Sequence, residues 1–361
     1  MADVQGFRAV RYSGAAGPLA DLVAPPYDAI SQEEREQLGI RSPYNVVHLT
    51  LPDSVEHAGQ LYRTWLSEGV LKREAEPAAW FIAEEYTGPD GVGRERRGIV
   101  ASLAAEPYET GTVLPHERTY RRTKEERLQL LRETLVYPEP LFLLVDGSLG
   151  VDRPETAPDV EVSGTRLWRL PDTDAGSLLG DAQLLIADGH HRYETALVFG
   201  AEAPAEENRV MALIVSTGDP GLHVFPTHRV FSGRPDLRDG GEDEQVGNVE
   251  EALVRLAEEP YERSVAIAYR KGGAEIVHGR EGELDVELVD RHGLDGITYT
   301  ARTHEAIAAV DSGEADAAFL LREPRLEDVF AVARRGELMP SKSTYFFPKP
   351  LSGLLFHPVD R

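Results

Sequence analysis

Residues 184–197 read LLIADGHHRYETAL, which joins an apolar run of strand length, a tight turn at Asp188-Gly189 and a pattern that a helix can adopt. A strand that enters a helix in this way leaves backbone N–H groups free at the N-terminus of the helix. The helix dipole favours negative charge at the same point, so such a turn can hold an anion. The stretch therefore predicts an anion-binding site at the start of a helix.

The side chains of this turn also suit a phosphate. Gly189 has no side chain to keep a ligand away from the backbone, and His190, His191 and Arg192 add two imidazoles and a guanidinium. Asp188 contributes a carboxylate that can bind a metal ion or a proton. A common Asp-Gly turn followed by surface His and Arg is the structural alternative. Because the three basic groups directly follow an apolar strand pattern, we predict a functional site.

The composition is that of a folded, acidic protein. The chain has 361 residues, of which 41% are hydrophobic and 28% charged, so it can bury a sizeable core. Its formal net charge of −24 repels a polyanion, and nucleic acid is not expected as a partner. A small phosphorylated substrate can still bind in a locally basic pocket. The absence of cysteine excludes disulfides, thiolate catalysis and cysteine-ligated metal centres.

The chain shows no targeting or membrane signal. Its first residues, MADVQGF, lack a basic-then-apolar pattern, and no apolar run approaches the roughly 20 residues of a membrane span. We therefore expect a cytoplasmic protein without a membrane partner. The oligomeric state does not follow from the sequence.

Strand and helix patterns are mixed along the chain, which predicts an α+β (mixed α/β) fold. Expected strands lie at 7–12, 46–51, 80–86, 97–103, 141–145, 166–170, 211–215, 264–270, 274–278 and 317–321. Expected helices lie at 56–70, 123–136, 174–180, 248–258, 303–310 and 325–335, with a further short helix after a capping box at Ser31. We expect a catalytic region at 1–240 with its phosphate-binding turn at 188–192, and a second lobe at 241–361 whose 339–349 segment returns to the cleft.

A second candidate segment, LPHERT at 114–119, precedes a helix that Thr123 can cap. Glu117 lies in this loop, and Arg118 begins one of the few locally basic stretches in an acidic chain. A solvated helix entrance is the structural alternative. In the functional interpretation, Glu117 is a carboxylate placed beside cations that hold phosphate.

Three further segments carry candidate residues. Asp28 ends a rigid proline loop, where it either faces a site or makes a turn. His228 and Arg229 repeat the pairing of an imidazole with a guanidinium at a strand end. Within 339–349, Lys342 lies among hydroxyl groups that include Ser343 and Thr344, and this segment either closes over a site or is a plain connection.

Together these groups fit phosphoryl transfer better than other chemistry. That reaction needs cations that spread the developing charge, a metal held by carboxylate, and a base for the attacking hydroxyl. Glu117 can accept the hydroxyl proton if it lies within hydrogen-bond reach. A zinc hydrolase is disfavoured because His190 and His191 are adjacent and point different ways, and the chain has no His-Glu-x-x-His pattern. Segment 87–93 lacks the Gly-Lys-Ser/Thr of a nucleotide loop, and Gly-x-Ser-x-Gly is absent.

The motifs resemble a known family over nearly the whole chain. They are VAPPYD at 23–28, SPYNV at 42–46, LPHERT at 114–119, ADGHHRYETA at 187–196, PTHR at 226–229 and KSTYF at 342–346, and they resemble domain-of-unknown-function family 1015. The DGHHR element is also similar to the phosphate-binding box of the ParB/sulfiredoxin-like superfamily. That superfamily includes CTP-binding partition proteins and free-serine kinases. The resemblance implies a ParB/sulfiredoxin-like core.

The resemblance further implies a pyrophosphate-dependent serine kinase, which makes O-phosphoserine from L-serine with Mg²⁺. Glu117 is then the base on the serine hydroxyl, and the turn at 188–192 grips the donor phosphates. The expected catalytic residues are Glu117, Asp188 and His190, with Asp188 also as the metal ligand. The expected phosphate- or substrate-binding residues are Gly189, His191, Arg192, Thr195, Arg118, His228, Arg229, Lys342, Ser343, Thr344 and Asp28.

Other functions remain open on the sequence. A phosphoserine phosphatase, or a kinase that uses ADP or ATP, needs the same groups, and the reaction can run from phosphoserine to serine. A nucleotide-binding regulator predicts CTP or ATP binding without transfer, together with a DNA-binding appendage. No such appendage is visible in the sequence, and the net charge of −24 disfavours DNA.

Overall fold

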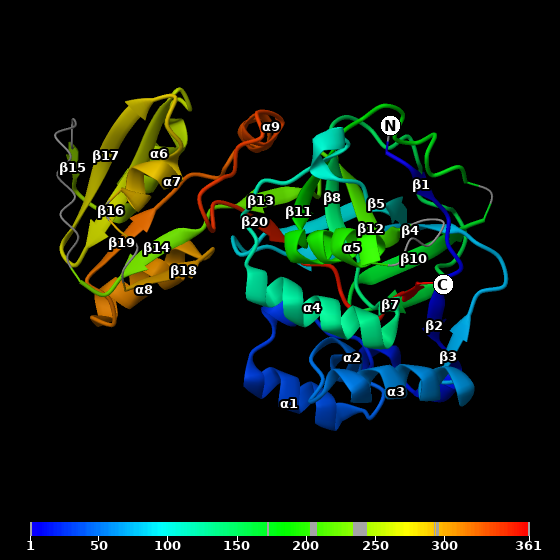
Figure 1. Cartoon of the computed structure of the whole chain (residues 1–361). Coiled ribbons are helices and arrows are strands. Elements are labelled where there is room, and N and C mark those ends of the chain that lie inside the picture. Colours follow the sequence, from blue (N-terminus) through cyan, green and yellow to red (C-terminus); the bar gives the residue numbers. More distant parts are fainter. Residues whose placement is uncertain are drawn as a thin grey trace.

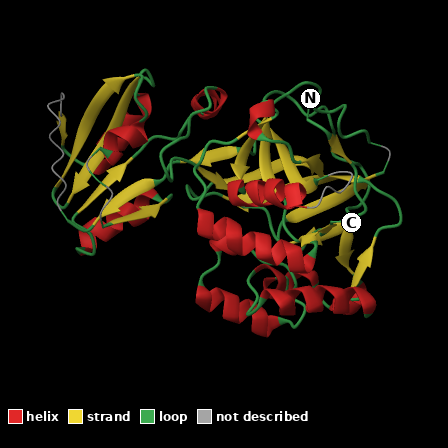
Figure 2. Cartoon of the chain, in the orientation of Figure 1, coloured by secondary structure: helices red, strands yellow, loops and turns green. Residues whose placement is uncertain are grey.

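The computed structural model describes residues 2–171, 173–202, 208–233, 244–291, 293 and 296–359. Two lobes are visible in Figure 1, a larger one that contains both chain termini and a smaller one built mainly from residues 228–231 and 244–320. Helices and strands occur in both lobes (Figure 2), which confirms the expected mixed α and β fold. No helix in the described part of the chain is long and apolar enough to cross a membrane.

The larger lobe is organised around a mixed sheet. Its strands follow the order β6 (Val113–Leu114), β11 (Leu184–Asp188), β8 (Leu141–Val145), β12 (Arg209–Ser216), β5 (Gly93–Ala104), β4 (Ala79–Thr87), β10 (Thr165–Leu170) and β9 (Val160–Val162), and β1 (Val4–Gln5) pairs with β5. β4 and β5 contain the strands expected at 80–86 and 97–103, and they pair antiparallel. β11 pairs parallel with β6 and antiparallel with β8, while β8 and β12 run parallel.

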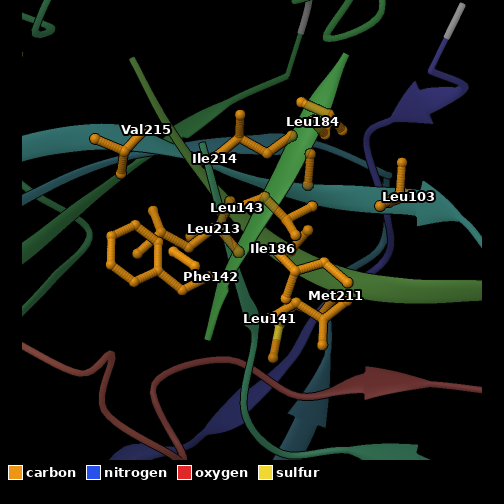
Figure 3. Packing of buried hydrophobic residues seen from close by; sticks show 14 of the residues in the cluster. Leu103, Leu141, Phe142, Leu143, Leu184, Ile186, Met211, Leu213, Ile214 and Val215 are labelled. Carbon is orange, nitrogen blue, oxygen red and sulfur yellow. The ribbon is translucent and has the colours of Figure 1, made fainter. Parts of the chain in front are cut away.

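The core of this lobe lies where β8, β11 and β12 meet. Side chains such as Phe142, Leu143, Ile186, Met211 and Ile214 are fully buried and pack against one another (Figure 3). Both faces of these strands are covered, which explains why their sequences are continuous apolar runs and not alternating patterns. The apolar run that opens the 184–197 stretch is thus buried in the core of the lobe. This packing fixes the position of the turn that follows it.

Helices cover one face of the sheet in successive layers (Figure 1). α5 (His190–Glu202) leaves β11 directly, α4 (Arg121–Thr134) packs on α5, and α3 (Val55–Ser67) packs on α4. α1 (Gln32–Arg41) and α2 (Val47–Thr50) complete the helical layer. The predicted capping box is confirmed, since Ser31 and Glu34 cap α1 reciprocally.

Three local predictions were wrong. A strand was expected at 46–51, but residues 47–50 form α2, because the Asn45 side chain accepts a hydrogen bond of 2.9 Å from the backbone N–H of Val47 and turns the chain. Residues 174–180 form turns, in which the Asp174 carboxylate accepts hydrogen bonds from the next backbone N–H groups. α4 begins at Arg121, ahead of the expected cap at Thr123.

The smaller lobe is a second sheet with helices on both faces. Its order is β15 (Glu244–Val246), β17 (Gly273–Glu281), β16 (Arg263–Arg270), β19 (Ala317–Leu320), β14 (His228–Phe231) and β18 (Ile297–Thr300). α6 (Val249–Glu258) and α8 (Thr303–Ser312) cover one face, and α7 (Asp285–Asp290) covers the other. Alternate residues of β16 enter the two apolar clusters, as expected for a strand buried on both sides.

The chain passes between the lobes more than once. β14 already belongs to the smaller lobe, and the boundary expected at 240 lies outside the described residues. α9 (Leu326–Arg334) packs against the core of the larger lobe, and β20 (Tyr345–Phe347) pairs with β13 (His223–Phe225).

The remaining elements are β2 (Val10–Tyr12) with β3 (Leu71–Arg73), β7 (Val136–Tyr137) with β21 (His357–Pro358), and the 3₁₀ turns η1 (Gly14–Ala16), η2 (Leu19–Asp21), η3 (Tyr27–Ala29) and η4 (Tyr108–Thr110). The ParB/sulfiredoxin-like core stays a prediction.

Candidate active site

A cavity of about 870 Å³ opens at the β11–α5 turn, where the two lobes meet. Its walls come from η3, the loop after β6, the turn itself, residues 299–305 of the smaller lobe and residues 341–349. The cationic side chains in the wall are Arg118, Arg192, Arg302, Lys342 and Lys349, and the acidic ones are Asp28, Glu117, Asp188 and Glu305. In a chain of net charge −24, this concentration of cations makes the cavity a locally favourable place for an anion.

The β11–α5 turn requires glycine at its centre. Gly189 has φ of 101°, a left-handed conformation, and an added Cβ would lie 2.9 Å from Cδ2 of Leu141 and 3.1 Å from an Nη of Arg192. The strand-turn-helix prediction for this stretch is confirmed, since α5 begins at His190 directly after the turn. The N-terminus of α5 therefore faces the cavity with its dipole oriented to attract an anion.

Arg192 is anchored inside the larger lobe. Its guanidinium donates a hydrogen bond of 2.9 Å to Oδ2 of Asp188 and another to the carbonyl oxygen of Pro140, and its Nε lies 3.7 Å from Oε1 of Glu139. Burial by itself lowers its pKa, but the carboxylates of Glu139 and Asp188 outweigh burial and raise it. Arg192 lines the cavity, but its guanidinium already contacts Asp188, Pro140 and Glu139, so its main role in this structure is to hold Asp188 in place.

Lys349 is a site residue that the sequence interpretation missed. Its Nζ lies 2.5 Å from Oδ2 of Asp28 and 2.8 Å from Oδ1 of Asp188. Burial on its own raises the pKa of Asp188, but Lys349 and Arg192 outweigh burial and lower it. Asp188 is therefore an ionised carboxylate with each oxygen already paired to a cation, which does not suit the catalytic role expected of it.

His116 and His190 form a buried pair of neutral imidazoles. The backbone N–H of His116 donates to Nε2 of His190 at 3.2 Å, so the proton of neutral His190 lies on Nδ1. His116 contacts the Ile186 carbonyl through Nδ1 at 2.7 Å and the Thr344 hydroxyl through Nε2 at 3.1 Å. Burial lowers the pKa of His116 to about 4 and lowers the pKa of His190 well below its ordinary value. At neutral pH these rings are polar contacts and not cations.

His191 points away from His190, as expected for adjacent residues. Its Nε2 accepts a hydrogen bond of 2.8 Å from the backbone N–H of Tyr120, and the Tyr120 ring stacks on it with centroids 5.9 Å apart. Burial lowers the pKa of His191 as well. The imidazole therefore fixes the loop that leads from Glu117 to α4 against the start of α5.

Glu117 lines the same cavity as the β11–α5 turn. Its half-buried carboxylate makes no hydrogen bond or ion pair with the described residues. Burial raises its pKa, and the nearby charges are those of Lys342, Asp188, Lys349 and Asp28. A carboxylate whose pKa is raised and whose oxygens have no partner among the described residues is suited to accept a proton from a substrate.

The 339–349 segment lies along the cavity, with Lys342, Thr344 and Lys349 in its wall. Lys342 has φ of 57°, which is unusual for a residue with a side chain. This conformation is held by Arg229, which donates to the carbonyl oxygens of Lys342 at 3.1 Å and Ser341 at 3.3 Å. The cation at 342 is thus placed by a fixed backbone.

Four expected contact residues do not line this cavity. Arg229 is fully buried with its donors on backbone oxygens and Asp290, and His228 bonds to the Thr303 hydroxyl and the Leu321 N–H. The remaining two are hydroxyl groups already used by the backbone, since Ser343 donates to the Pro340 carbonyl and Thr195 to that of His191. The phosphate contacts expected of these four residues are therefore not supported, because their polar atoms have internal partners.

Aromatic side chains complete the wall, and the sequence interpretation missed them. Tyr27 and Tyr345 lie inside motifs already quoted, so their proximity to Asp28 and Thr344 was the available signal. Tyr299 and Arg302 come from the smaller lobe, and no sequence pattern indicated that β18 and the start of α8 reach the cavity.

A magnesium ion held by the protein through Asp188 fits this donor set poorly. Both carboxylate oxygens of Asp188 already contact cations. Across the described residues, no group of three or more His, Cys, Asp or Glu side chains is gathered to hold a metal ion. Mg²⁺ in phosphotransferases commonly binds through one or two carboxylates together with the phosphates of the substrate.

Comparison with known proteins confirms the resemblance seen in the motifs. A curated relative, the ADP-dependent L-serine kinase SerK of Thermococcus kodakarensis, is 27% identical over 172 residues, which span 46% of this chain and 67% of that protein. Among solved structures, a free serine kinase in complex with AMP aligns over 72% of this chain and 92% of its own, at 16% identity and a TM-score of 0.42. SbnI with a C-terminal truncation from Staphylococcus aureus aligns over 72% and 87%, at 11% identity and a TM-score of 0.43. The model of the family described as "Protein of unknown function (DUF1015)" matches residues 4–311, and the chain belongs to this family.

Proposed function

We propose that the protein is a phosphotransferase that moves a phosphoryl group from a diphosphate-bearing donor to the hydroxyl of L-serine. The observation that carries this proposal is that Glu117 shares one cavity with an anion-attracting helix N-terminus. Burial raises the pKa of its carboxylate, which has no hydrogen-bond or ion-pair partner among the described residues. The likeness to a relative named as a serine kinase supports the same chemistry.

In this proposal Glu117 is the general base. It accepts the proton of the serine hydroxyl as the hydroxyl oxygen forms a bond to the phosphorus of the donor, and the bond from phosphorus to the bridging oxygen breaks. The products are O-phosphoserine and the remainder of the donor, which is orthophosphate from pyrophosphate or AMP from ADP. Burial raises the pKa of Glu117, which increases the basicity of its carboxylate.

The donor phosphates occupy the end of the cavity at the start of α5. There the free backbone N–H groups after Gly189, together with Lys342 and Arg118, supply positive potential for the charge that develops on the transferred group. Asp188 positions cations, and His190 is a neutral contact whose ring is oriented by His116. Mg²⁺ enters the proposal as part of the donor complex and not as an ion bound by Asp188.

Two donors carry the required diphosphate group. The curated relative is named as an ADP-dependent kinase, which supports ADP, whereas the resemblance found in the sequence implied pyrophosphate. A cavity of about 870 Å³ is within the range that holds a small ligand with a nucleotide-sized neighbour. We propose ADP as the first donor to test and pyrophosphate as the second.

The test is a donor panel with purified full-length protein, L-serine, Mg²⁺ and, in separate reactions, ADP, ATP and pyrophosphate. O-phosphoserine should form with at least one diphosphate donor, and Glu117→Gln should abolish it. Glu125→Gln is the matched control, because Glu125 lies on the nearby helix and its partner is the exposed Arg121. Hydrolysis of phosphoserine without transfer would indicate a phosphatase, and tight CTP or ATP binding without turnover would indicate a regulator.

A further inference from the structure

The ammonium of Lys349 joins two carboxylates from distant parts of the chain. Asp28 belongs to η3 near the N-terminus, Asp188 ends β11, and Lys349 follows β20 close to the C-terminus. The Nζ atom lies within 2.8 Å of one oxygen of each carboxylate. All three residues line the cavity, so these three charged groups lie where an anion would bind.

A lysine ammonium has three N–H donors. Two of them contact Asp28 and Asp188, and the third has no acceptor among the residues that the structure describes. The Lys349 side chain is 20% exposed, so it is neither fully enclosed nor free in solvent. The third N–H is therefore available to a ligand in the cavity.

We propose that Lys349 makes the α5 end of the cavity able to bind phosphate, by compensating Asp28 and Asp188 and by donating its third N–H to a phosphate oxygen. This inference about Lys349 rests on the proposed function for the identity of the ligand, but phosphate binding can be measured without phosphoryl transfer.

The electrostatic reason is that two carboxylates lie beside the place where a dianion would bind. Two carboxylates and a phosphate group repel one another strongly in a partly buried site, so each carboxylate needs a nearby cation. Arg192 compensates one oxygen of Asp188, but Asp28 has Lys349 as the cation within reach in the described contacts. Without Lys349, phosphate would meet an excess of negative charge.

The alternative is that Lys349 tethers the C-terminal segment and takes no part in binding. The two roles differ in their response to a second substitution. If Lys349 compensates the charge of Asp28, then removing that charge restores part of the phosphate affinity that is lost with Lys349. If Lys349 is only a tether, removing Asp28 changes the affinity no more in Lys349→Met than it does in the parent protein.

The experiment measures the Kd of inorganic pyrophosphate by calorimetry, in the absence of serine, for the full-length protein and its variants. Lys349→Met should weaken binding by roughly ten- to a hundredfold, the usual effect of losing a hydrogen bond to a charged group. Lys349→Met with Asp28→Asn should recover several-fold of this loss. Lys124→Met is the matched control, because Lys124 forms an ion pair of 2.6 Å with Glu194 and does not line the cavity. Its Kd should stay that of the parent.

Asp28→Asn alone gives an independent test if Lys349→Met does not fold. It removes a negative charge and leaves Lys349 in place, so pyrophosphate should bind more tightly than to the parent protein. Weaker binding to Asp28→Asn, or an unchanged Kd in folded Lys349→Met, would overturn the inference. Because binding is measured without turnover, a protein that binds pyrophosphate through Lys349 but makes no phosphoserine refutes the proposed function and leaves this inference intact.

Discussion

The guanidinium of Arg229 donates a hydrogen bond of 3.1 Å to the carbonyl oxygen of Lys342. This contact joins a fully buried side chain of the smaller lobe to a residue whose cation lies at the cavity. Arg229 was expected to touch phosphate directly. The contact instead gives it a positioning role, because it holds Lys342 in the left-handed conformation of φ 57°.

Arg229→Lys should therefore raise the KM of the donor and lower kcat/KM by roughly tenfold or more, since the compact ammonium of lysine cannot reach the separate oxygens that the planar guanidinium spans. Steady-state kinetics of the proposed reaction check this. Combined with Lys342→Ala, the substitution should cost much less than it does alone, because the two residues act as one unit. Full additivity of the two effects would contradict the positioning role.

Gly189→Ala should lower both stability and activity. An alanine at φ 101° is strained, and its Cβ would also lie 2.9 Å from Cδ2 of Leu141. Gly272→Ala is the matched control, because Gly272 has the same φ of 101° with no atom within 4 Å of an added Cβ. Thermal unfolding should show a larger loss for Gly189→Ala. Equal losses would mean that backbone strain alone, and not the close contact, demands glycine in the turn.

Ionisation of Glu117 should affect activity and stability in opposite directions, so the two should change oppositely with pH. Its folded-state pKa is raised, so the stability it contributes is present below its ordinary value of 4.5 and is lost as pH rises through the raised pKa. Glu117→Gln removes this cost and should be more stable than the parent at pH 7, although inactive. Denaturant unfolding of both proteins at pH 4 and pH 7 measures the difference. A variant that is less stable at pH 7 would contradict the burial of an unpaired carboxylate.

The pH–rate profile offers a separate check on the same group. Because the base must be ionised, kcat/KM should fall as pH decreases through a value above 4.5. The substitution Glu117→Asp should retain some activity with a shifted acid limb. An acid limb that is the same in both proteins would assign the titration to another group.

His116 should limit stability in acid. Its pKa is lowered from 6.5 to about 4 by burial, so its contribution is present above the unfolded value and is lost as pH falls from 6.5 towards 4. His116→Gln, which cannot titrate, should show a flatter dependence of Tm on pH over this interval. A Tm that falls as steeply with decreasing pH in His116→Gln as in the parent protein would contradict this role of His116.

The sequence predicted the elements whose patterns are local. The apolar runs of β8, β11 and β12, the capping box at Ser31 and the strand-turn-helix at Gly189 follow from periodicity and from turn chemistry, and the structure confirms them. The helix at 47–50 was missed because a short apolar run fits a strand equally well, and a side-chain hydrogen bond from Asn45 decided between the two.

Long-range contacts could not be predicted in the same way. Lys349 meets Asp28 across most of the chain, and Arg302 reaches the cavity from the smaller lobe, so neither contact leaves a spacing that can be recognised. His228 and Arg229 carried the same residue types as His191 and Arg192, but burial within the smaller lobe gave them internal partners. Residue type indicated phosphate chemistry, whereas burial decided which of these groups face the cavity.

The most direct measurement is the formation of O-phosphoserine from L-serine with ADP or pyrophosphate by the parent protein and by Glu117→Gln. We expect product with at least one of these donors from the parent protein and from Glu125→Gln, and none from Glu117→Gln. Transfer by Glu117→Gln at the parent rate, or no transfer by the parent protein with any donor of the panel, would contradict the assignment of Glu117 as the base of a serine phosphotransferase.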